Sequence, residues 1–131
     1  VQVLIENVGL YNKHSLLYDQ PEFLELLTDL PEADALLDTG HAHINGWNLP
    51  GIVHALGNRL KACHLHDNQG VLDEHLPIGE GNIEWKPFFE SIQASAPTAT
   101  MVFEYANTDI ENALHNINTV QDQYLTALNN H

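Results

Sequence analysis

Apolar and polar positions along this chain follow a pattern that predicts four short strands, each followed by a helix. The expected strands are short apolar runs at residues 1–6, 33–37, 61–66 and 99–103. After each of them, apolar side chains recur at helical spacing, which predicts helices at residues 20–30, 48–56, 85–94 and from 109 to 128. A strand, a helix and another strand at this spacing give right-handed crossovers and a parallel sheet. The chain is therefore expected to be an α/β protein.

Capping residues mark where two of these helices begin. Asp19 precedes the first helix, Pro21 fits its first turn, and Glu22 completes a capping box with Asp19. Thr108 is expected to cap the last helix, with Glu111 at the same capping-box distance. These signals predict the starts of the first and the last helix.

Each predicted strand ends in, or close to, a carboxylate or an imidazole. These side chains belong to Glu6, Asp38, His64 and Glu104. In a (β/α)8 barrel the chemistry lies at the carboxyl ends of the strands, and a full barrel takes about 250 residues. The 131 residues therefore suggest one unit, 1–131, that forms half of such a barrel. A doubly wound open sheet remains the alternative, although it would not usually direct four ligand side chains from four strands to one point.

The stretch from 61 to 83 holds the densest group of candidate ligands. His64 and His66 lie two apart on a strand, so both imidazoles point to the same face. A turn composition at 67–70 follows, and then Asp73 and His75, again an acid and an imidazole with one residue between them. Core packing does not readily explain four such side chains on one strand and its loop, so we interpret them as candidate metal ligands.

This loop closes with Gly79-Glu-Gly81, shortly before the helix expected at 85–94. Backbone N–H groups at a helix N-terminus can hold a phosphate, which makes Gly79 and Gly81 candidates for binding the phosphate of a substrate. A tight turn is the simpler explanation of the two glycines.

The charge of the chain argues against one large class of partners. Four basic residues stand against eighteen acidic ones, which gives a net charge of −14. Lys and Arg supply the non-specific affinity for nucleic acids, so we do not expect nucleic acid to be a partner.

Two further features bear on the compartment and the extent of the chain. The single cysteine, Cys63, rules out a disulfide within the chain and suits a reducing cytoplasm. No apolar run approaches the roughly 20 residues that span a bilayer. The chain starts inside a strand-like pattern, Val-Gln-Val, which we interpret as a cut upstream of which residues are missing.

The motifs at the strand ends resemble those of one superfamily. The chain is similar to the xylose-isomerase-like barrels, which include sugar and sugar-phosphate isomerases and epimerases together with endonuclease IV. The matching elements run in the family's order across nearly the whole chain, as Ile5-Glu-Asn7, Asp38-Thr-Gly-His41-Ala, His64-Leu-His-Asp67, Asp73-Glu-His75, Gly79-Glu-Gly81 and Phe103-Glu104. The resemblance implies the C-terminal half of a (β/α)8 barrel, that is, its last four βα units.

The resemblance also implies a ligand set. In the isomerase and epimerase branch, one divalent metal would be held by the four strand-end positions, which are Glu6, Asp38, His64 and Glu104 in this chain. Glu6 and Glu104 would in addition act as the acid and base pair, His41 would contact substrate oxygens, and His66 is a further candidate for metal or substrate. The nuclease branch binds three zinc ions, and its further ligands match His41, Asp73 and His75.

The chemistry of these side chains agrees with the implied reaction. Three carboxylates and one imidazole suit Mn, Mg, Co or Zn. Sugar isomerisation removes a proton next to a carbonyl, and a metal can stabilise the enediolate that results. A carboxylate on each face of the substrate can remove and return that proton.

Three classes of function remain open. The first is a metal-dependent sugar or sugar-phosphate isomerase or epimerase, and the second is an abasic-site endonuclease with three zinc ions. The third is a half-barrel that binds metal without catalysing a reaction.

Four βα units cannot close a barrel, so the inner face of the sheet is expected to be partly wet, with Val3, Ile5, Ala35 and Leu37 as candidates for its side chains. Either a missing N-terminal half or a second copy of the chain should cover this face.

Overall fold

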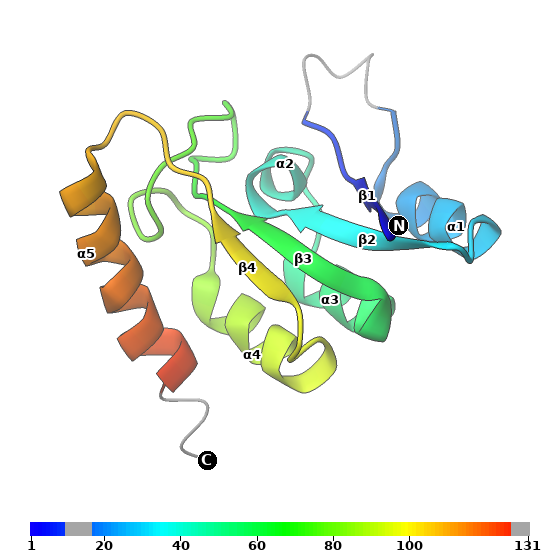
Figure 1. The fold of residues 1–131 in the computed structure, drawn as a ribbon. Helices are drawn as coiled ribbons and strands as arrows, with labels where there is room; N and C mark the ends of the chain where they lie inside the picture. Colours follow the sequence, from blue (N-terminus) through cyan, green and yellow to red (C-terminus); the bar gives the residue numbers. More distant parts are fainter. Residues whose placement is uncertain (10–16, 127–131) are drawn as a thin grey trace.

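Four parallel strands form one sheet in the computed structural model, which describes residues 1–9 and 17–126 (Figure 1). The strands are β1 (Val3–Glu6), β2 (Ala33–Asp38), β3 (Leu60–Leu65) and β4 (Thr100–Phe103), and they lie in the order of the sequence. Each pair of neighbours is parallel, with a register shift between Ala35 and Leu36 of β2. The predicted α/β fold of four βα units is confirmed.

The predicted helices are present, with small changes in their bounds. They are α1 (Gln20–Asp29), α3 (Leu49–Leu56), α4 (Trp85–Ser95) and α5 (Ile110–Val120). A 3-10 turn, η1 (Gly57–Arg59), follows α3, and a π-helical turn, η2 (Gln121–Thr126), continues α5. The expected extension of the last helix to Leu128 lies outside the described residues.

One helix was not predicted from the sequence. The short helix α2 (Thr39–Ile44) begins directly after β2, and the side chain of Asp38 caps it by accepting a hydrogen bond from the backbone N–H of His41. Six residues are too few to give an apolar periodicity, so only the capping contact marks this helix.

The two capping predictions have opposite outcomes. At α1 the capping box is confirmed, because Asp19 and Glu22 each accept a hydrogen bond from the backbone N–H of the other. At α5 the prediction of Thr108 is wrong, since the cap is Asp109, whose side chain accepts from the backbone N–H of Asn112. Asp and Thr are both good capping residues, so two adjacent candidates made the choice from sequence ambiguous.

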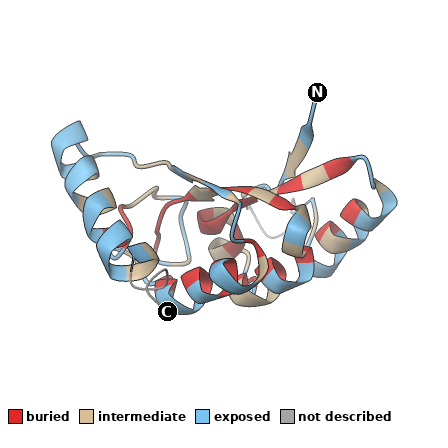
Figure 2. Ribbon diagram, turned by 60° about the horizontal axis from the view of Figure 1, so that its bottom comes forward, coloured by how far each residue is buried: buried red, intermediate tan, exposed pale blue. Residues whose placement is uncertain are grey.

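The helices cover one face of the sheet and leave the other face open (Figure 2). Buried side chains of the sheet, the helices and the loops between them form the core, among them Ala35, Leu37, Cys63, Leu65, Ile52, Val53, Phe88 and Phe89. Burial raises the pKa of the Cys63 thiol to about 12, so this thiol is a packed side chain rather than a nucleophile.

The sequence-based choice of side chains for the open face is wrong. Ala35 and Leu37 are fully buried on the face that the helices cover, and Val3 and Ile5 share that face because they are paired with Ala33 and Ala35. The open face instead carries Leu36, together with Leu4, Ala62 and Val102, of which Val102 is 39% exposed. Side chains alternate along a strand, so a residue directly before a site-facing acid such as Glu6 or Asp38 must point to the helices.

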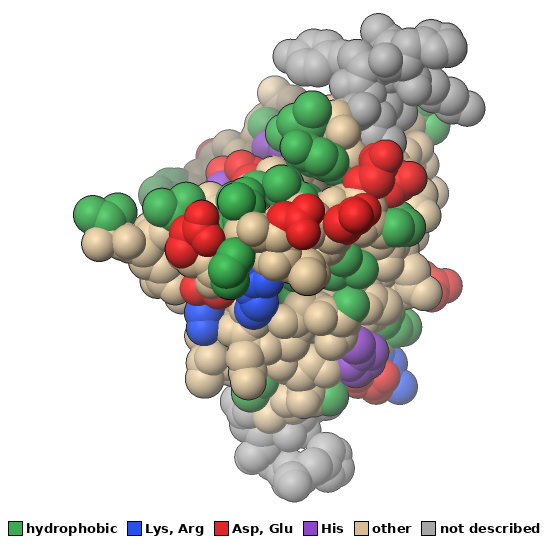
Figure 3. Space-filling model, turned by 90° about the vertical axis from the view of Figure 1, so that its right-hand side faces the viewer, with side chains coloured by type: hydrophobic (Ala, Val, Ile, Leu, Met, Phe, Trp, Pro, Cys, Tyr) green, Lys and Arg blue, Asp and Glu red, His purple; other side chains and the backbone are tan. Residues whose placement is uncertain are grey.

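The open sheet also has two unpaired edges, at β1 and at β4. Figure 3 views the molecule from the side of α1 and β1, where hydrophobic and acidic side chains lie close together and few basic ones are visible. In residues 1–9 and 17–126, every helix is too short or too polar to cross a membrane.

Candidate metal centre

The four strand ends bring the predicted ligands to one edge of the sheet. Glu6 ends β1, Asp38 ends β2, His64 lies near the end of β3, and Glu104 directly follows β4. The register pairs Asp38 with His64, and the backbone N–H of Glu104 donates to the carbonyl of Leu65 at 3.0 Å. Parallel strands make this convergence unavoidable, because their carboxyl ends meet at the same rim.

His64 lies between the two glutamates. Its Nδ1 atom is 3.1 Å from Oε1 of Glu6 and 3.3 Å from Oε2 of Glu104. Both carboxylates are 38% exposed, so they remain accessible to a ligand from the open side of the sheet. Glu6 and Glu104, the predicted acid and base pair, thus come from the two edge strands of the sheet, and both contact the imidazole of His64.

Asp38 is the buried member of the set, with only 1% of its side chain exposed. Its carboxylate lies 2.9 Å from Nε2 of His66 and accepts the backbone N–H of His41 at 2.9 Å. Burial alone would raise the pKa of Asp38, but the hydrogen bond with His66 and the donors around it outweigh that effect and lower the pKa below its ordinary value. The structure therefore favours an ionised carboxylate at this position.

The side chain of Asn7 holds the backbone of Asp38 in place, a role that was not predicted from the sequence. Its side-chain amide donates to the carbonyl of Asp38 at 3.0 Å and accepts the backbone N–H of Asp38 at 2.7 Å. Asn7 is buried and directly follows Glu6, so this pair of bonds aligns the ends of β1 and β2. Its place in the Ile5-Glu-Asn7 motif was the available signal.

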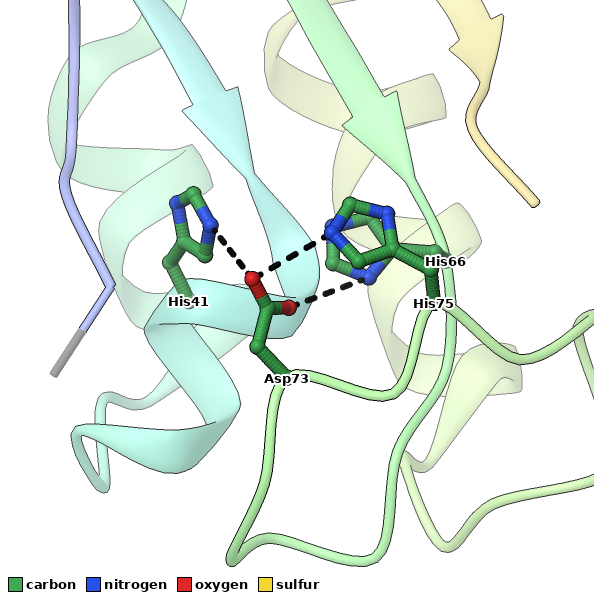
Figure 4. Close-up of side chains that lie close together, drawn as sticks. All are labelled: His41, His66, Asp73 and His75. Carbon is green, nitrogen blue, oxygen red and sulfur yellow. Dashed lines mark hydrogen bonds and ion pairs between the residues drawn. The ribbon is translucent and has the colours of Figure 1, made fainter. Parts of the chain in front are cut away.

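A second group of side chains surrounds Asp73 (Figure 4). Its Oδ2 atom lies 3.2 Å from Nε2 of His41 and 3.2 Å from Nε2 of His75, and its Oδ1 atom lies 3.8 Å from Nδ1 of His66. The rings of His66 and His75 are stacked, with centroids 3.8 Å apart. The structure thus brings together all four side chains that the sequence offered as additional candidates.

His66 is fully buried and uses only one of its ring nitrogens. Its Nε2 atom pairs with Asp38, whereas Nδ1 has no hydrogen-bond partner among the residues that the structure describes. Gly40 makes room for this ring, since a Cβ at Gly40 would overlap it. A buried ring nitrogen without a partner usually indicates a ligand or an ordered water.

The ligand atoms are close enough to hold cations. Those of Glu6, Asp38 and His41 lie within 4.8 Å of one another, as do those of Asp38, His66 and Glu104. The ligand atoms of His41, His66, Asp73 and His75 form a third such group. His64 forms its contacts with the two glutamates rather than with Asp38, so the four strand-end ligands do not form one such group in the described residues. Carboxylate and imidazole donors at these distances fit a divalent metal.

The two glycines that were candidates for phosphate binding have another role. The backbone N–H of Gly79 donates to Oδ2 of Asp67 at 2.9 Å, and Gly79 has a φ of +97°. Gly81 allows a close approach, because a Cβ there would overlap Asn68 and Asp67. A phosphate would have to compete with a buried carboxylate for the Gly79 N–H, so the contacts favour the tight-turn explanation.

Comparison with known proteins agrees with this geometry. Residues 1–125 match the protein family described as xylose isomerase-like TIM barrel. The chain belongs to this family. The suspected membership in the xylose isomerase-like barrels is therefore confirmed, and the sheet is half of such a barrel.

Two curated relatives come from Methanocaldococcus jannaschii. The uncharacterized protein MJ1614 is 31% identical over 111 residues, which cover 85% of this chain and 41% of that protein. The uncharacterized protein MJ1311 is 30% identical over 135 residues, which cover 98% of this chain and 44% of that protein. The xylose isomerase-like chain thus spans less than half the length of these curated relatives.

Solved structures with the same arrangement are sugar epimerases or resemble them. A D-tagatose 3-epimerase-like protein matches with a TM-score of 0.80 and 27% identity, over 99% of this chain and 49% of that one. A D-psicose 3-epimerase, solved in the presence of D-fructose, matches with a TM-score of 0.75, over 93% of this chain and 49% of that one. Its identity of 16% shows a common fold and no more.

The surroundings of His41 lead to a prediction about pH. Burial would lower the pKa of His41, but Asp38, the Asn7 carbonyl, Asp73 and Glu6 together raise it above its ordinary value. A histidine whose pKa is higher in the folded than in the unfolded protein makes its full contribution to stability at a pH below its pKa in the unfolded protein, which is about 6.5. This contribution is lost as the pH rises through the pKa that the histidine has in the folded protein. With EDTA present, the stability difference between the wild type and His41→Gln should therefore narrow from about pH 5 to about pH 9.

Urea melts of both proteins across this range would measure that difference. His115→Gln is the matched control, because it removes an exposed imidazole from α5, away from the strand ends. A stability difference for His41→Gln that stays constant with pH would contradict the prediction.

Proposed function

We propose that the chain carries the metal-binding active site of a sugar or sugar-phosphate isomerase or epimerase. One observation carries the proposal, namely that the exposed carboxylates of Glu6 and Glu104 both contact His64 at the rim of the sheet. The likeness at 27% identity to a D-tagatose 3-epimerase-like protein supports the same class of reaction.

A divalent cation fits the donors at this rim. Glu6, Asp38, His64 and Glu104 would hold it, with Asp38 as the buried anchor and the other three closer to solvent. Without a cation, carboxylates that converge in this way repel one another, and the histidines between them offset part of that repulsion. When bound, Mn, Mg, Co or Zn would supply positive charge that polarises the substrate carbonyl and stabilises an enediolate.

Proton transfer would fall to the two glutamates. They reach the open face of the sheet from opposite edge strands, β1 and β4, so they can approach a bound substrate from its two sides. One carboxylate would remove the proton next to the carbonyl, and the other would return it on the opposite face, which inverts the stereocentre. His41, which is half-buried beside Asp38, would donate a hydrogen bond to a substrate hydroxyl.

The substrate would be a small polyhydroxylated ketose. A phosphate on it remains open in our proposal, although the use of the Gly79 N–H by Asp67 favours a sugar without one. The buried thiol of Cys63 agrees with a reducing compartment such as the cytoplasm.

A second candidate function is supported by the group around Asp73. The contacts of Asp73 with His41 and His75 favour further cations, as an abasic-site endonuclease would need. Nδ1 of the buried His66, which has no hydrogen-bond partner among the described residues, favours them as well. The net charge of −14 argues against a nucleic-acid substrate. A half-barrel that binds metal without catalysis is the third alternative.

We further propose that another half-barrel covers the open face of the sheet. The chain covers 49% of the D-tagatose 3-epimerase-like protein, and Leu4, Leu36 and Val102 lie on a face that the described residues leave uncovered. Parallel sheets normally have both faces covered. The N-terminal half of the same polypeptide is the preferred cover, and a second copy of the chain is the alternative.

The chain should contain at least one divalent metal per molecule when it is purified without chelator. EDTA should then lower its melting temperature, because a cation at 100 times its Kd stabilises the fold by about 2.7 kcal/mol. Elemental analysis and thermal melts measure both effects. Asp38→Asn should lose the metal, whereas Asp34→Asn, which removes a carboxylate of β2 that faces Arg59, should retain it. Metal well below one equivalent and a melt that EDTA does not change would contradict this prediction.

The complete protein should exchange the proton next to the carbonyl of a ketose. In D₂O, a panel of ketoses and ketose phosphates should take up deuterium at that carbon, which NMR detects. Glu104→Gln should lower the exchange rate by about a hundredfold or more, because one partner of the proton transfer is lost. Glu25→Gln, at an exposed position on α1, should leave the rate unchanged. Cleavage of an abasic oligonucleotide without exchange into any sugar would favour the nuclease instead.

The 131-residue chain by itself should associate. Its open sheet face exposes apolar side chains, and the edge strands β1 and β4 expose backbone N–H and C=O groups that can pair with another chain, so both favour association. Light scattering should give a mass above that of one copy, and joining the chain to its N-terminal half should give a monomer. A dimer of defined mass would favour the second copy as the cover, and a folded monomer with a cooperative melt would defeat both proposals.

A further inference from the structure

Asp67 carries a buried carboxylate that no part of the proposed reaction uses. The residue directly follows the site-facing His66 and is fully buried. Its Oδ1 atom accepts the backbone N–H groups of Asn68 at 2.9 Å and Ile83 at 3.1 Å. Its Oδ2 atom accepts the backbone N–H of Gly79 at 2.9 Å and the indole N–H of Trp85 at 2.8 Å.

These donors lie at both ends of one loop, which runs from 68 to 82. Asn68 begins the loop and Gly79 lies near its end. Ile83 directly follows the loop, and Trp85 is the first residue of α4. The backbone adds three bonds, two between Asp67 and Leu76 at 2.8 and 2.9 Å and one from Asn82 to the carbonyl of Asn68 at 2.9 Å. Asp67 therefore ties the end of β3, both ends of the loop and the start of α4 to one point.

The tied loop carries two residues of the candidate site, Asp73 and His75, and the backbone of His75 has a conformation that needs support. His75 has a φ of +51°, in the left-handed region that a histidine adopts only at a cost. It stacks on His66, its Nδ1 atom lies 3.1 Å from the Glu104 carbonyl, and its Nε2 atom meets Asp73. A loop that is fixed at both ends can hold His75 at its positive φ, whereas a loosely attached loop would allow the backbone of His75 to relax to a negative φ.

We propose that Asp67 is the positioning residue of this site, and that its carboxylate fixes the 68–82 loop so that Asp73 and His75 meet His41 and His66. The inference rests on the proposed function only in that Asp73 and His75 belong to the site. A carboxylate suits the place because it is an acceptor at every lone pair, and all four of its partners are N–H donors. An asparagine of the same size would turn an NH₂ group toward one pair of these donors.

The test compares three variants of the full chain, with EDTA present so that metal does not contribute. Asp67→Asn removes the acceptor for two of the four donors, and Trp85→Phe removes one donor and leaves the carboxylate. Asp34→Asn is the control for the loss of one carboxylate away from the loop, because Asp34 lies near the start of β2, at the opposite end of this strand from the candidate site, and pairs with Arg59. The readouts are amide hydrogen exchange by segment and the imidazole signals of the histidines by NMR.

In Asp67→Asn, amide exchange should rise about tenfold or more in residues 68–83, and remain unchanged in β2 and α3. The imidazole signals of His75 and His41 should shift, while those of His54 and His115, which lie exposed on α3 and α5, should not. Trp85→Phe should give the same pattern with a smaller increase, and it serves as the test if Asp67→Asn does not fold. Asp34→Asn should change neither readout.

Unmoved signals of His75 in a folded Asp67→Asn, or a rise in exchange spread evenly over the chain, would overturn the proposal. Neither readout depends on turnover of a sugar. Failure of the ketose exchange in the wild type would therefore count against the proposed function and not against the positioning role of Asp67.

Discussion

The buried carboxylate of Asp38 is the contact on which the rest of the candidate site depends. It caps α2 through the His41 N–H, pairs with the buried His66, and lies close enough to Glu6 and Glu104 to share a cation with each. Asn7 fixes the backbone of Asp38 to the end of β1. One side chain thus joins the strand ends to the group around Asp73, so a change there would disturb both.

Charge compensation explains why histidines are interleaved with the acids. Each exposed acid in the site, namely Glu6, Glu104 and Asp73, lies within 3.3 Å of an imidazole nitrogen. An imidazole can neutralise a carboxylate when it is protonated and can ligate a metal when it is neutral. The same residues can therefore form a stable arrangement without a cation and then exchange these contacts for bonds to a metal. The raised pKa of His41 agrees with the protonated form in the absence of a cation.

The open face of the sheet sets the limits of what this half-barrel can do by itself. The candidate ligands lie at its rim, where three groups of ligand atoms in the described residues are close enough to hold a cation. A substrate bound there would have protein on one side only, whereas exclusion of water from a reacting centre strengthens every electrostatic interaction in it. Another half-barrel over this face would supply the second wall.

The order of the elements and the residues at the strand ends could be predicted from local sequence patterns. Hydrophobic periodicity is local, so the four strands and the four main helices could be predicted, and Glu6, Asp38, His64 and Glu104 followed because parallel strands end at one rim. Local patterns also indicated the capping box at Asp19. Structural features that depend on contacts between residues far apart in the sequence could not be predicted in this way.

The three-dimensional structure was needed to show which side chains pair. It placed Asp109 rather than Thr108 at the start of α5, and it put Leu36 rather than Leu37 on the open face. It also formed α2 from a segment without periodicity, and showed that His66 lies against Asp38 while His64 lies between the two glutamates. Asp67 lies in a segment with the composition of a turn. The four N–H groups that donate to its carboxylate, however, come from residues as far along the chain as Trp85. Such donors are brought together by the path of the loop, which local sequence does not specify.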